Sequence, residues 1–233
     1  MMQEAIILAG GLGTRLRSVV QELPKSLAPI NEKPFLEYLL DYLINQGITQ
    51  FIFSVGYKSS HIEQHFGERY KNCSIVYAVE EEPLGTGGGI KFAMEKVEGE
   101  HALVVNGDTI FLADVKELHN FHTKQNADVS LALKPLKEFD RYGSVEIEND
   151  KIVSFKEKQF VKEGVINGGV YLFNKKAFSS FDLPEKFSIE KDFFEKYATE
   201  LSLGAFVTDQ YFLDIGIPED FEKAQHEFKQ LKY

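Results

Sequence analysis

A glycine-rich turn near the amino terminus carries the residue types that bind phosphate. Residues 8–15 place three glycines within four positions and end in Thr14 and Arg15. Glycine lets backbone N–H groups approach a polyphosphate closely, and a guanidinium donates paired hydrogen bonds to its oxygens. Pro24-Lys25 adds a second cation on a stretch that the proline stiffens. Together, the two stretches predict a polyphosphate site.

The spacing of these glycines excludes two commoner nucleotide motifs. The dinucleotide motif G-x-G-x-x-G requires glycine at position 16, where Leu16 stands. The P-loop ends in Gly-Lys-Ser or Gly-Lys-Thr, and Thr14-Arg15 does not supply that ending. A dinucleotide-dependent oxidoreductase is therefore excluded, since an obvious acid–base partner is also lacking. For the glycines alone, a tight connection after a strand stays open as an alternative.

Two aspartates stand at the ends of apolar runs, where they could hold a metal ion. Asp108 follows a run that ends at residue 105, and Asp214 directly precedes Ile215-Gly216. Mg²⁺ commonly takes one or two carboxylates and completes its coordination with phosphate oxygens and water. Either aspartate, considered alone, could instead bond its own backbone in a turn.

The elements that position these residues alternate between strands and helices in the first half. Apolar runs predict buried strands at residues 5–8, 51–55, 75–79 and 102–105. A leucine stripe over residues 36–43 predicts a helix that ends at Gly47. A capping box of Ser60 and Glu63 predicts a second helix, which ends at Gly67. This alternation predicts parallel strands with ligands at their carboxyl ends.

The second half predicts a hairpin, a further strand and two helices. Apolar runs at residues 144–147 and 152–155 flank the turn pair Asn149-Asp150, and residues 165–173 predict another strand. Ser188 is placed to cap a helix that runs through residue 197, and Pro218 to begin a final amphipathic helix. Neither an internal repeat nor a long linker interrupts the sequence, which favours one domain over residues 1–233.

These motifs, in this order, resemble the sugar-1-phosphate nucleotidylyltransferases over nearly the whole chain. The motifs that carry the resemblance cover residues 8–16, 24–30, 33–34, 83–89, 106–109, 157–158, 167–171 and 214–216. The resemblance implies a GT-A-like α/β fold: a Rossmann-like mixed, mainly parallel sheet flanked by helices. It also implies a nucleotide-binding half at about 1–135 and a sugar-binding half at about 136–233. We expect no carboxyl-terminal left-handed β-helix.

The resemblance implies a role for each motif in joining a nucleoside triphosphate to a sugar 1-phosphate. Arg15, Lys25 and Asp108 are implied to be catalytic, and Asp108 and Asp214 to hold Mg²⁺. The residues implied to bind the nucleotide are Leu8, Ala9, Gly10, Gly11, Gly13, Thr14, Arg15, Lys25, Glu80, Pro83, Gly85, Thr86, Asn106 and Gly107. The residues implied to bind the sugar phosphate are Gly143, Glu157, Lys158, Asn167 and Gly168. Many relatives have proline after Glu-Lys, whereas this chain has Gln159.

Glu80 is the residue expected to select the base. Guanine presents adjacent N1–H and N2–H₂ donors that one carboxylate can accept in parallel, and uracil and thymine present no such pair. Residues 141–143 and 187–192 look most like the heptose 1-phosphate guanylyltransferases, which implies GTP as substrate and GDP-heptose for a surface glycan. A mannose 1-phosphate guanylyltransferase and an amino-sugar 1-phosphate uridylyltransferase remain alternatives. A non-catalytic nucleotide-binding regulatory domain is the alternative outside this class.

Composition limits the partners and the compartment. With 36 acidic and 26 basic residues the net charge is −10, which disfavours nucleic acid as a partner. Neither a signal peptide nor a membrane-length apolar run is present and Cys73 is the only cysteine, so we expect a cytoplasmic protein without disulfides. The histidine pairs 61/65 and 119/122 lack a third ligand and are expected on solvated helix faces. A homodimer stays open.

Overall fold

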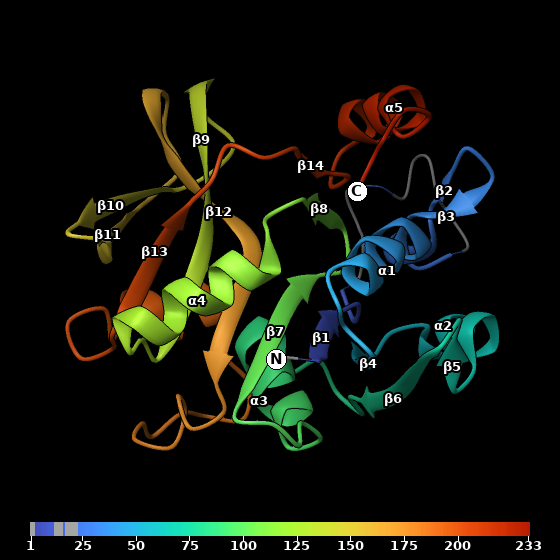
Figure 1. The fold of residues 1–233 in the computed structure, drawn as a ribbon, viewed down its shortest axis with the longest axis horizontal. Coiled ribbons are helices and arrows are strands. Elements are labelled where there is room, and N and C mark those ends of the chain that lie inside the picture. Colours follow the sequence, from blue (N-terminus) through green and yellow to red (C-terminus); the bar gives the residue numbers. More distant parts are fainter. Residues whose placement is uncertain (1–2, 12–15, 17–22) are drawn as a thin grey trace.

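The computed structural model describes residues 3–11, 16 and 23–233, and ten strands of this part of the chain form one sheet (Figure 1). The strand order is β10-β11-β13-β9-β12-β7-β1-β4-β6-β5. The four strands predicted for the first half are all present: β1 (Glu4–Leu8), β4 (Gln50–Val55), β6 (Cys73–Val79) and β7 (His101–Asn106). They lie side by side in the order β7-β1-β4-β6, and each pair is parallel. Their carboxyl ends therefore meet at one edge of the sheet.

Helices and two small sheets complete the described part of the chain. The helices are α1 (Phe35–Asn45), α2 (Ser59–Phe66), α3 (Gly85–Met94), α4 (Val115–Gln125), α5 (Pro218–Glu227), the 3₁₀ turn η2 (Lys25–Leu27) and the π-helical segment η3 (Ile189–Glu195). The other strands are β2 (Pro29–Ile30), β3 (Lys33–Pro34), β5 (Arg69–Tyr70), β8 (Thr109–Phe111), β9 (Val129–Phe139), β10 (Ser144–Glu148), β11 (Lys151–Lys156), β12 (Val161–Asn174), β13 (Leu203–Val207) and β14 (Phe212–Asp214). Strand β14 pairs with β8, and β2 pairs with β3, outside the large sheet.

Both faces of the parallel strands are covered by helices. On one face, side chains such as Ile7 and Phe53 pack against α1, α2 and α4. On the other face, Ile6 and Ile52 pack against α3 and η3. Because both faces are buried, the strands appear in the sequence as nearly continuous apolar runs. None of the helices in the described residues is long and apolar enough to cross a membrane.

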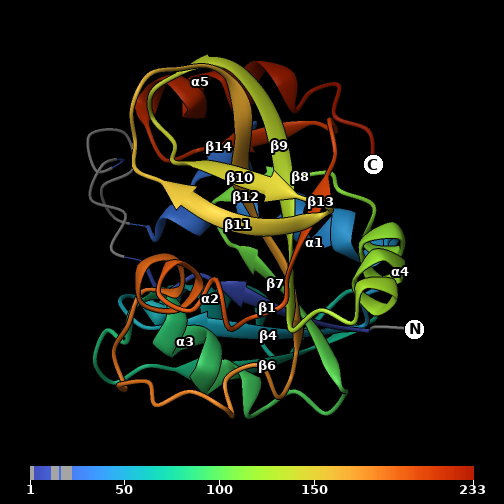
Figure 2. The ribbon, with the colours of Figure 1, turned by 90° about the vertical axis from the view of Figure 1, so that its left-hand side faces the viewer.

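The second half builds a curved, largely antiparallel extension of the sheet. Asn149 and Asp150 have φ of 50° and 62°, which confirms the predicted tight turn between β10 and β11. Because β10 also pairs with β12, the five strands β9 to β13 close on one another. Figure 2 shows β10 and β11 lying across β9, β12 and β13. The ring of Phe194 from η3 lies against Phe155 and Phe173 of these strands. The sheet is thus mixed, as expected, but antiparallel pairing prevails after residue 129.

One predicted helix start is wrong, and one helix differs in type. Helix α2 begins at Ser59 behind Lys58, whose backbone is left-handed (φ 60°), and no side chain caps it. Ser60 and Glu63 therefore do not form the predicted capping box. Ser188 does accept a hydrogen bond from the backbone N–H of Lys191, as predicted, but the segment that it caps is π-helical. Such segments often occur at functional sites.

The histidine on the inner side of α4 is buried, which contradicts the expectation of a solvated face. His122 is 1% exposed, and its Nδ1 is hydrogen-bonded to the Ser130 hydroxyl at 2.9 Å. Its ring also contacts His101, with ring centroids 5.1 Å apart. Burial, together with the nearby His101 and His119, lowers the pKa of His122 to about 4. The imidazole is therefore neutral in the folded protein near pH 7.

This burial makes stability depend on pH in acidic solution. Because the pKa of His122 is lower in the folded chain, the unfolded chain binds the proton first as the pH falls below about 6.5. We expect the contribution of His122 to lower the free energy of unfolding by up to about 1.4 kcal/mol for each pH unit. This decrease should continue until the pH reaches the pKa of His122 in the folded chain, about 4. Urea unfolding at several pH values gives the free energy of unfolding as a function of pH. Between about pH 4 and 6.5, this free energy should depend less steeply on pH for His122→Asn than for the wild type. The same slope in both proteins would contradict this origin, and His226→Asn, at an exposed position, serves as control.

Candidate active site

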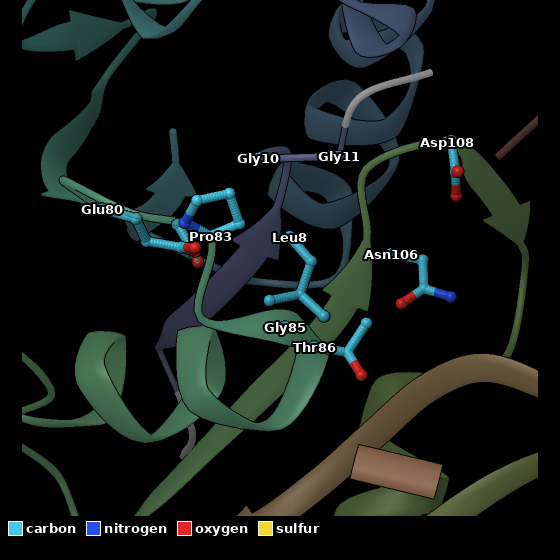
Figure 3. Close-up of a pocket in the computed structure, with 10 residues that line it drawn as sticks. Leu8, Gly10, Gly11, Glu80, Pro83, Gly85, Thr86, Asn106 and Asp108 are labelled. Atoms are coloured by element: carbon cyan, nitrogen blue, oxygen red, sulfur yellow. Dashed lines mark hydrogen bonds between the residues drawn. The ribbon is translucent and has the colours of Figure 1, made fainter. Parts of the chain in front are cut away.

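A pocket of about 290 Å³ opens where the parallel strands end. Its lining residues come from β1, β4, β7, the turns that follow β1, β6 and β7, and the start of α3: Leu8, Gly10, Gly11, Ser54, Glu80, Pro83, Gly85, Thr86, Asn106 and Asp108. The sequence or the resemblance assigned every one of these residues except Ser54. Figure 3 shows Glu80 and Pro83 at one end of the pocket, Leu8 in the middle and Asp108 at the other end. An elongated ligand could therefore reach both carboxylates.

Some residues implied to bind the nucleotide lie behind this pocket or outside the described part. The backbone N–H of Ala9 donates to Ser54 (2.9 Å), and that of Gly107 donates to Leu8 (2.9 Å). These two residues therefore tie the ends of neighbouring strands together. Gly13, Thr14 and Arg15 lie outside the described residues.

The second glycine run does more than line the pocket. Gly85 has φ of +75°, which favours glycine, and it is the first residue of α3. A Cβ on Gly87 would overlap the Phe187 ring, and a Cβ on Gly88 would overlap the carbonyl of Glu185. The glycines inside α3 therefore allow residues 185–187 to pack directly on the helix. This close packing explains why the run is helical rather than an open loop.

A lysine and two aspartates meet beside the Asp108 end of the pocket. Lys25 Nζ lies 2.6 Å from Asp108 Oδ2 and 3.5 Å from Asp214 Oδ1. The pairing of β14 with β8 brings the two aspartates together, and the backbone N–H of Ile215 donates to the carbonyl of Asp108 (3.0 Å). Burial and the charge of Asp108 raise the pKa of Asp214 above its usual value, so a cation at this point is favourable.

The donor set at this cluster fits a hard divalent cation. The carboxylates of Asp108 and Asp214 both contact the Lys25 ammonium, and this ammonium lies where a metal ion could bind. Both contribute oxygen, the ligand atom that Mg²⁺ prefers, and phosphate oxygens and water commonly supply the remaining ligands. Within the described residues, no group of three or more histidines, cysteines or carboxylates forms a separate metal cage.

A second pocket of about 300 Å³ lies between the hairpin β10–β11, strand β12 and η3. Its lining residues are Gly143, Ser144, Val145, Phe155, Lys156, Glu157, Lys158, Asn167, Ser188, Glu190, Lys191 and Glu195. Four of the five residues implied to bind the sugar phosphate are therefore gathered here. Gly168 is not among them, because it packs against the Phe111 ring, which a Cβ would overlap. Residues 188–191 were part of the subfamily resemblance, but their role in this pocket was missed.

Two contacts join the pockets. Thr86 of the first pocket donates to Glu190 of the second (Oγ1 to Oε2, 3.2 Å) and accepts from the backbone N–H of Ile189 (2.9 Å). Gly169, with φ of +70°, lies so close to Asn106 that a Cβ would be 2.5 Å from its Nδ2. The ends of β7 and the bulged part of β12 therefore touch directly. The residues around the two pockets are therefore in direct contact.

The subfamily motif at residues 141–143 links the second pocket to the aspartates. Arg141 Nη2 lies 2.8 Å from Asp220 Oδ2 at the start of α5. The Tyr142 ring packs edge-on against Phe212 of β14, with centroids 6.0 Å apart. Strand β14, which carries Asp214, is thus held against the loop that carries Gly143.

Similarity to known proteins identifies the family to which the chain belongs. The model of the nucleotidyl transferase family matches residues 4–230, and the chain belongs to this family. The chain is 54% identical to D-glycero-alpha-D-manno-heptose 1-phosphate guanylyltransferase of Aneurinibacillus thermoaerophilus, over 97% of this chain and 98% of that protein. It is 48% identical to the Campylobacter jejuni protein of the same name, over 94% and 96% of the two chains. The crystal structure of HddC from Yersinia pseudotuberculosis complexed with GMP-PN matches with a TM-score of 0.86 and 38% identity, over 97% and 100%. The resemblance and the fold class inferred from the sequence are confirmed.

The contact between Gly169 and Asn106 gives a test of how the site is held. Gly169→Ala and Gly47→Ala both place alanine at positive φ (+70° and +92°), which destabilises the fold by about 1 kcal/mol. Only Gly169→Ala also displaces a pocket residue, because the space around Gly47 is open. We expect nucleotidyl transfer to slow about tenfold or more for Gly169→Ala, and to stay near wild type for Gly47→Ala. Urea unfolding and initial rates measure the two effects, and equal rates for both variants would contradict the assignment.

Proposed function

We propose that this chain is a guanylyltransferase that joins GTP to D-glycero-α-D-manno-heptose 1-phosphate and releases pyrophosphate. The observation that carries the proposal is the cluster of Lys25, Asp108 and Asp214 beside one pocket, whose lining contacts that of a second pocket. The names of the relatives at 54% and 48% identity support the sugar and the base. The GMP-PN complex of HddC supports a guanine nucleotide in this fold.

In this proposal the two pockets divide the substrates. The base lies at the Glu80 end of the first pocket, and the triphosphate extends past Leu8 toward Asp108. The heptose lies in the second pocket, among Gly143, Glu157 and Asn167. The division of the chain into a nucleotide half and a sugar half is part of the same proposal.

The reaction is an in-line attack by a sugar-phosphate oxygen on the α-phosphorus of GTP. A phosphate monoester has a second pKa of about 6 and is largely dianionic at pH 7, so the attack needs no general base. The protein brings two anions together and offsets their charge. Lys25 is assigned to the α-phosphate, Lys158 to the sugar phosphate and Arg15, outside the described residues, to the departing pyrophosphate.

Mg²⁺ is the proposed cofactor, held by Asp108 and Asp214. When bound, it supplies positive charge against the phosphate oxygens. The aspartates themselves are oriented by this chain: the backbone N–H of Gly216 donates to Asp214 Oδ1 at 2.7 Å, and Thr109 Oγ1 donates to Asp108 Oδ1 at 3.2 Å. These bonds fix the carboxylates before any ligand arrives.

A pyrophosphate-release assay tests the proposed function. Four nucleoside triphosphates are combined with heptose, mannose, glucose and N-acetylglucosamine 1-phosphates. We expect GTP with the heptose to be fastest, and Asp108→Asn to be folded but slower by about 10²-fold or more. A preference for mannose 1-phosphate or for UTP would show that the proposed sugar or the proposed base is wrong. If no pair of substrates released pyrophosphate, a non-catalytic domain would be favoured.

Metal binding without nucleotide tests the carboxylate cluster separately from catalysis. Because the Lys25 ammonium lies between the two carboxylates, a divalent cation that binds there must compete with it. We expect Lys25→Met to bind Mn²⁺ about fivefold more tightly or better, the effect of removing a unit charge about 4 Å away in water. Electron paramagnetic resonance of free Mn²⁺ gives the affinity.

Lys33→Met is the matched control for this measurement. Lys33 lies 2.7 Å from Asp41, so its removal also takes a cation away from an aspartate, which still pairs with Lys71, and it changes the net charge equally. We expect its Mn²⁺ affinity to equal that of the wild type. Lys25→Met with wild-type affinity would show that the ion does not bind between Asp108 and Asp214.

A further inference from the structure

Ser54 is the one residue of the nucleotide pocket that neither motif nor resemblance singled out. It ends up 1% exposed near the carboxyl end of β4, with β1 on one side and β6 on the other. Few polar side chains in the described residues are this deeply buried. Its hydroxyl donates to Glu80 Oε1 at 2.9 Å. A buried hydroxyl that bonds a pocket carboxylate is placed to control where that carboxylate points.

The Glu80 carboxylate is held at both oxygens. Besides the bond from Ser54, its Oε2 accepts the backbone N–H of Leu84 at 3.0 Å. Its own backbone N–H donates to the carbonyl of Val55 at 2.7 Å, which fixes the main chain to β4. The side chain therefore has one defined orientation before a ligand binds.

The surrounding glycines leave room for this arrangement. A Cβ on Gly89 would lie 2.7 Å from Glu80 Oε1 and 2.9 Å from Ser54 Oγ, so any larger residue would push the pair apart. A Cβ on Gly10 would approach the same oxygen to 3.5 Å. Helix α3 and the first glycine turn thus close around the Ser54–Glu80 pair.

The remaining acceptor positions of Glu80 match one base. An ionised carboxylate offers about four acceptor positions, and the protein uses two of them. Two positions remain for a ligand with two adjacent donors. Guanine has such a pair in N1–H and N2–H₂, whereas adenine and cytosine present a donor beside an acceptor, and uracil presents one donor between acceptors.

We propose that Ser54 is a positioning residue for base selection, which acts by holding the Glu80 carboxylate in the plane that accepts both donors of guanine. This inference rests on the proposed function. Without the bond from Ser54, the Glu80 side chain would lose rotamer freedom when the base binds. The hydrogen bond to the guanine 2-amino group would then be weakened. A purely structural Ser54 would instead affect stability and leave the choice of base unchanged.

The test compares GTP with ITP, whose base keeps N1–H but lacks the 2-amino group. For wild type we expect kcat/KM to favour GTP by about ten- to a hundredfold, the effect of one hydrogen bond to a charged group. In Ser54→Ala we expect this ratio to fall by about two- to tenfold, because the 2-amino hydrogen bond is weakened and not lost altogether. The loss should appear in KM for GTP, with kcat and KM for the sugar 1-phosphate within about twofold of wild type.

Ser130→Ala is the matched control, because Ser130 is equally buried and its hydroxyl also bonds a titratable side chain, His122. Its ratio of GTP to ITP should stay at the wild-type value even if its stability falls. Glu80→Gln tests the premise, because the amide presents a donor to the guanine amino group, and its ratio should fall further than that of Ser54→Ala. If the wild-type enzyme is active on GTP and the ratio of GTP to ITP is unchanged in Ser54→Ala or in Glu80→Gln, the inference about Ser54 is wrong while the proposed function stands. A wild-type enzyme inactive with every nucleotide overturns the proposed function first.

Discussion

The ion pair of Lys25 with Asp108 and Asp214 is the constraint around which the rest of the site is arranged. The three residues are 83 and 106 positions apart along the chain, so they meet only because separate elements deliver them. Strand β7 and its turn place Asp108, and the pairing of β14 with β8 places Asp214. Gly216 completes the fit, since a Cβ there would lie 2.9 Å from Asp214 Oδ1 and 3.2 Å from Lys25 Nζ. Loss of any of these supports would separate the charges.

This local arrangement resolves the conflict between an acidic protein and anionic substrates. A net charge of −10 repels phosphate at long range, but screening limits that field to about 8–10 Å in physiological salt. Inside the site the charges of individual groups dominate. Lys25 is largely buried, with 12% of its side chain exposed, so water screens its charge little, whereas Lys158 at the rim is exposed. In the proposed mechanism, the buried Lys25 acts on the α-phosphate and the exposed Lys158 meets the incoming sugar phosphate.

The sequence predicted the parts of the fold that depend on local pattern. The apolar runs identified β1, β4, β6 and β7, and the rule that ligands bind at strand carboxyl ends located the pocket. Contacts between distant segments could not be predicted in this way. Glu190 reaches Thr86 across 104 positions, and the burial of Ser54 depends on β1 and β6 on either side of it. The predicted cap of α2 was wrong because Lys58 takes a left-handed backbone, which no local motif marks.

The glycine run at the start of α3 shows why the two pockets cannot be considered independently. A glycine run after a strand suggests phosphate binding, yet here Gly87 and Gly88 face residues 185–187, and only Gly85 and Thr86 reach the pocket. The backbone N–H of Gly87 donates to Phe187 at 3.0 Å, and that of Phe187 donates to Leu84 at 3.0 Å. The segment that continues into the second pocket is therefore hydrogen-bonded to Leu84, whose backbone N–H bonds Glu80. Under the proposed assignment of sugar and base to the two pockets, a change that moves this segment to admit another sugar would also move Leu84, and the two choices would be mechanically coupled.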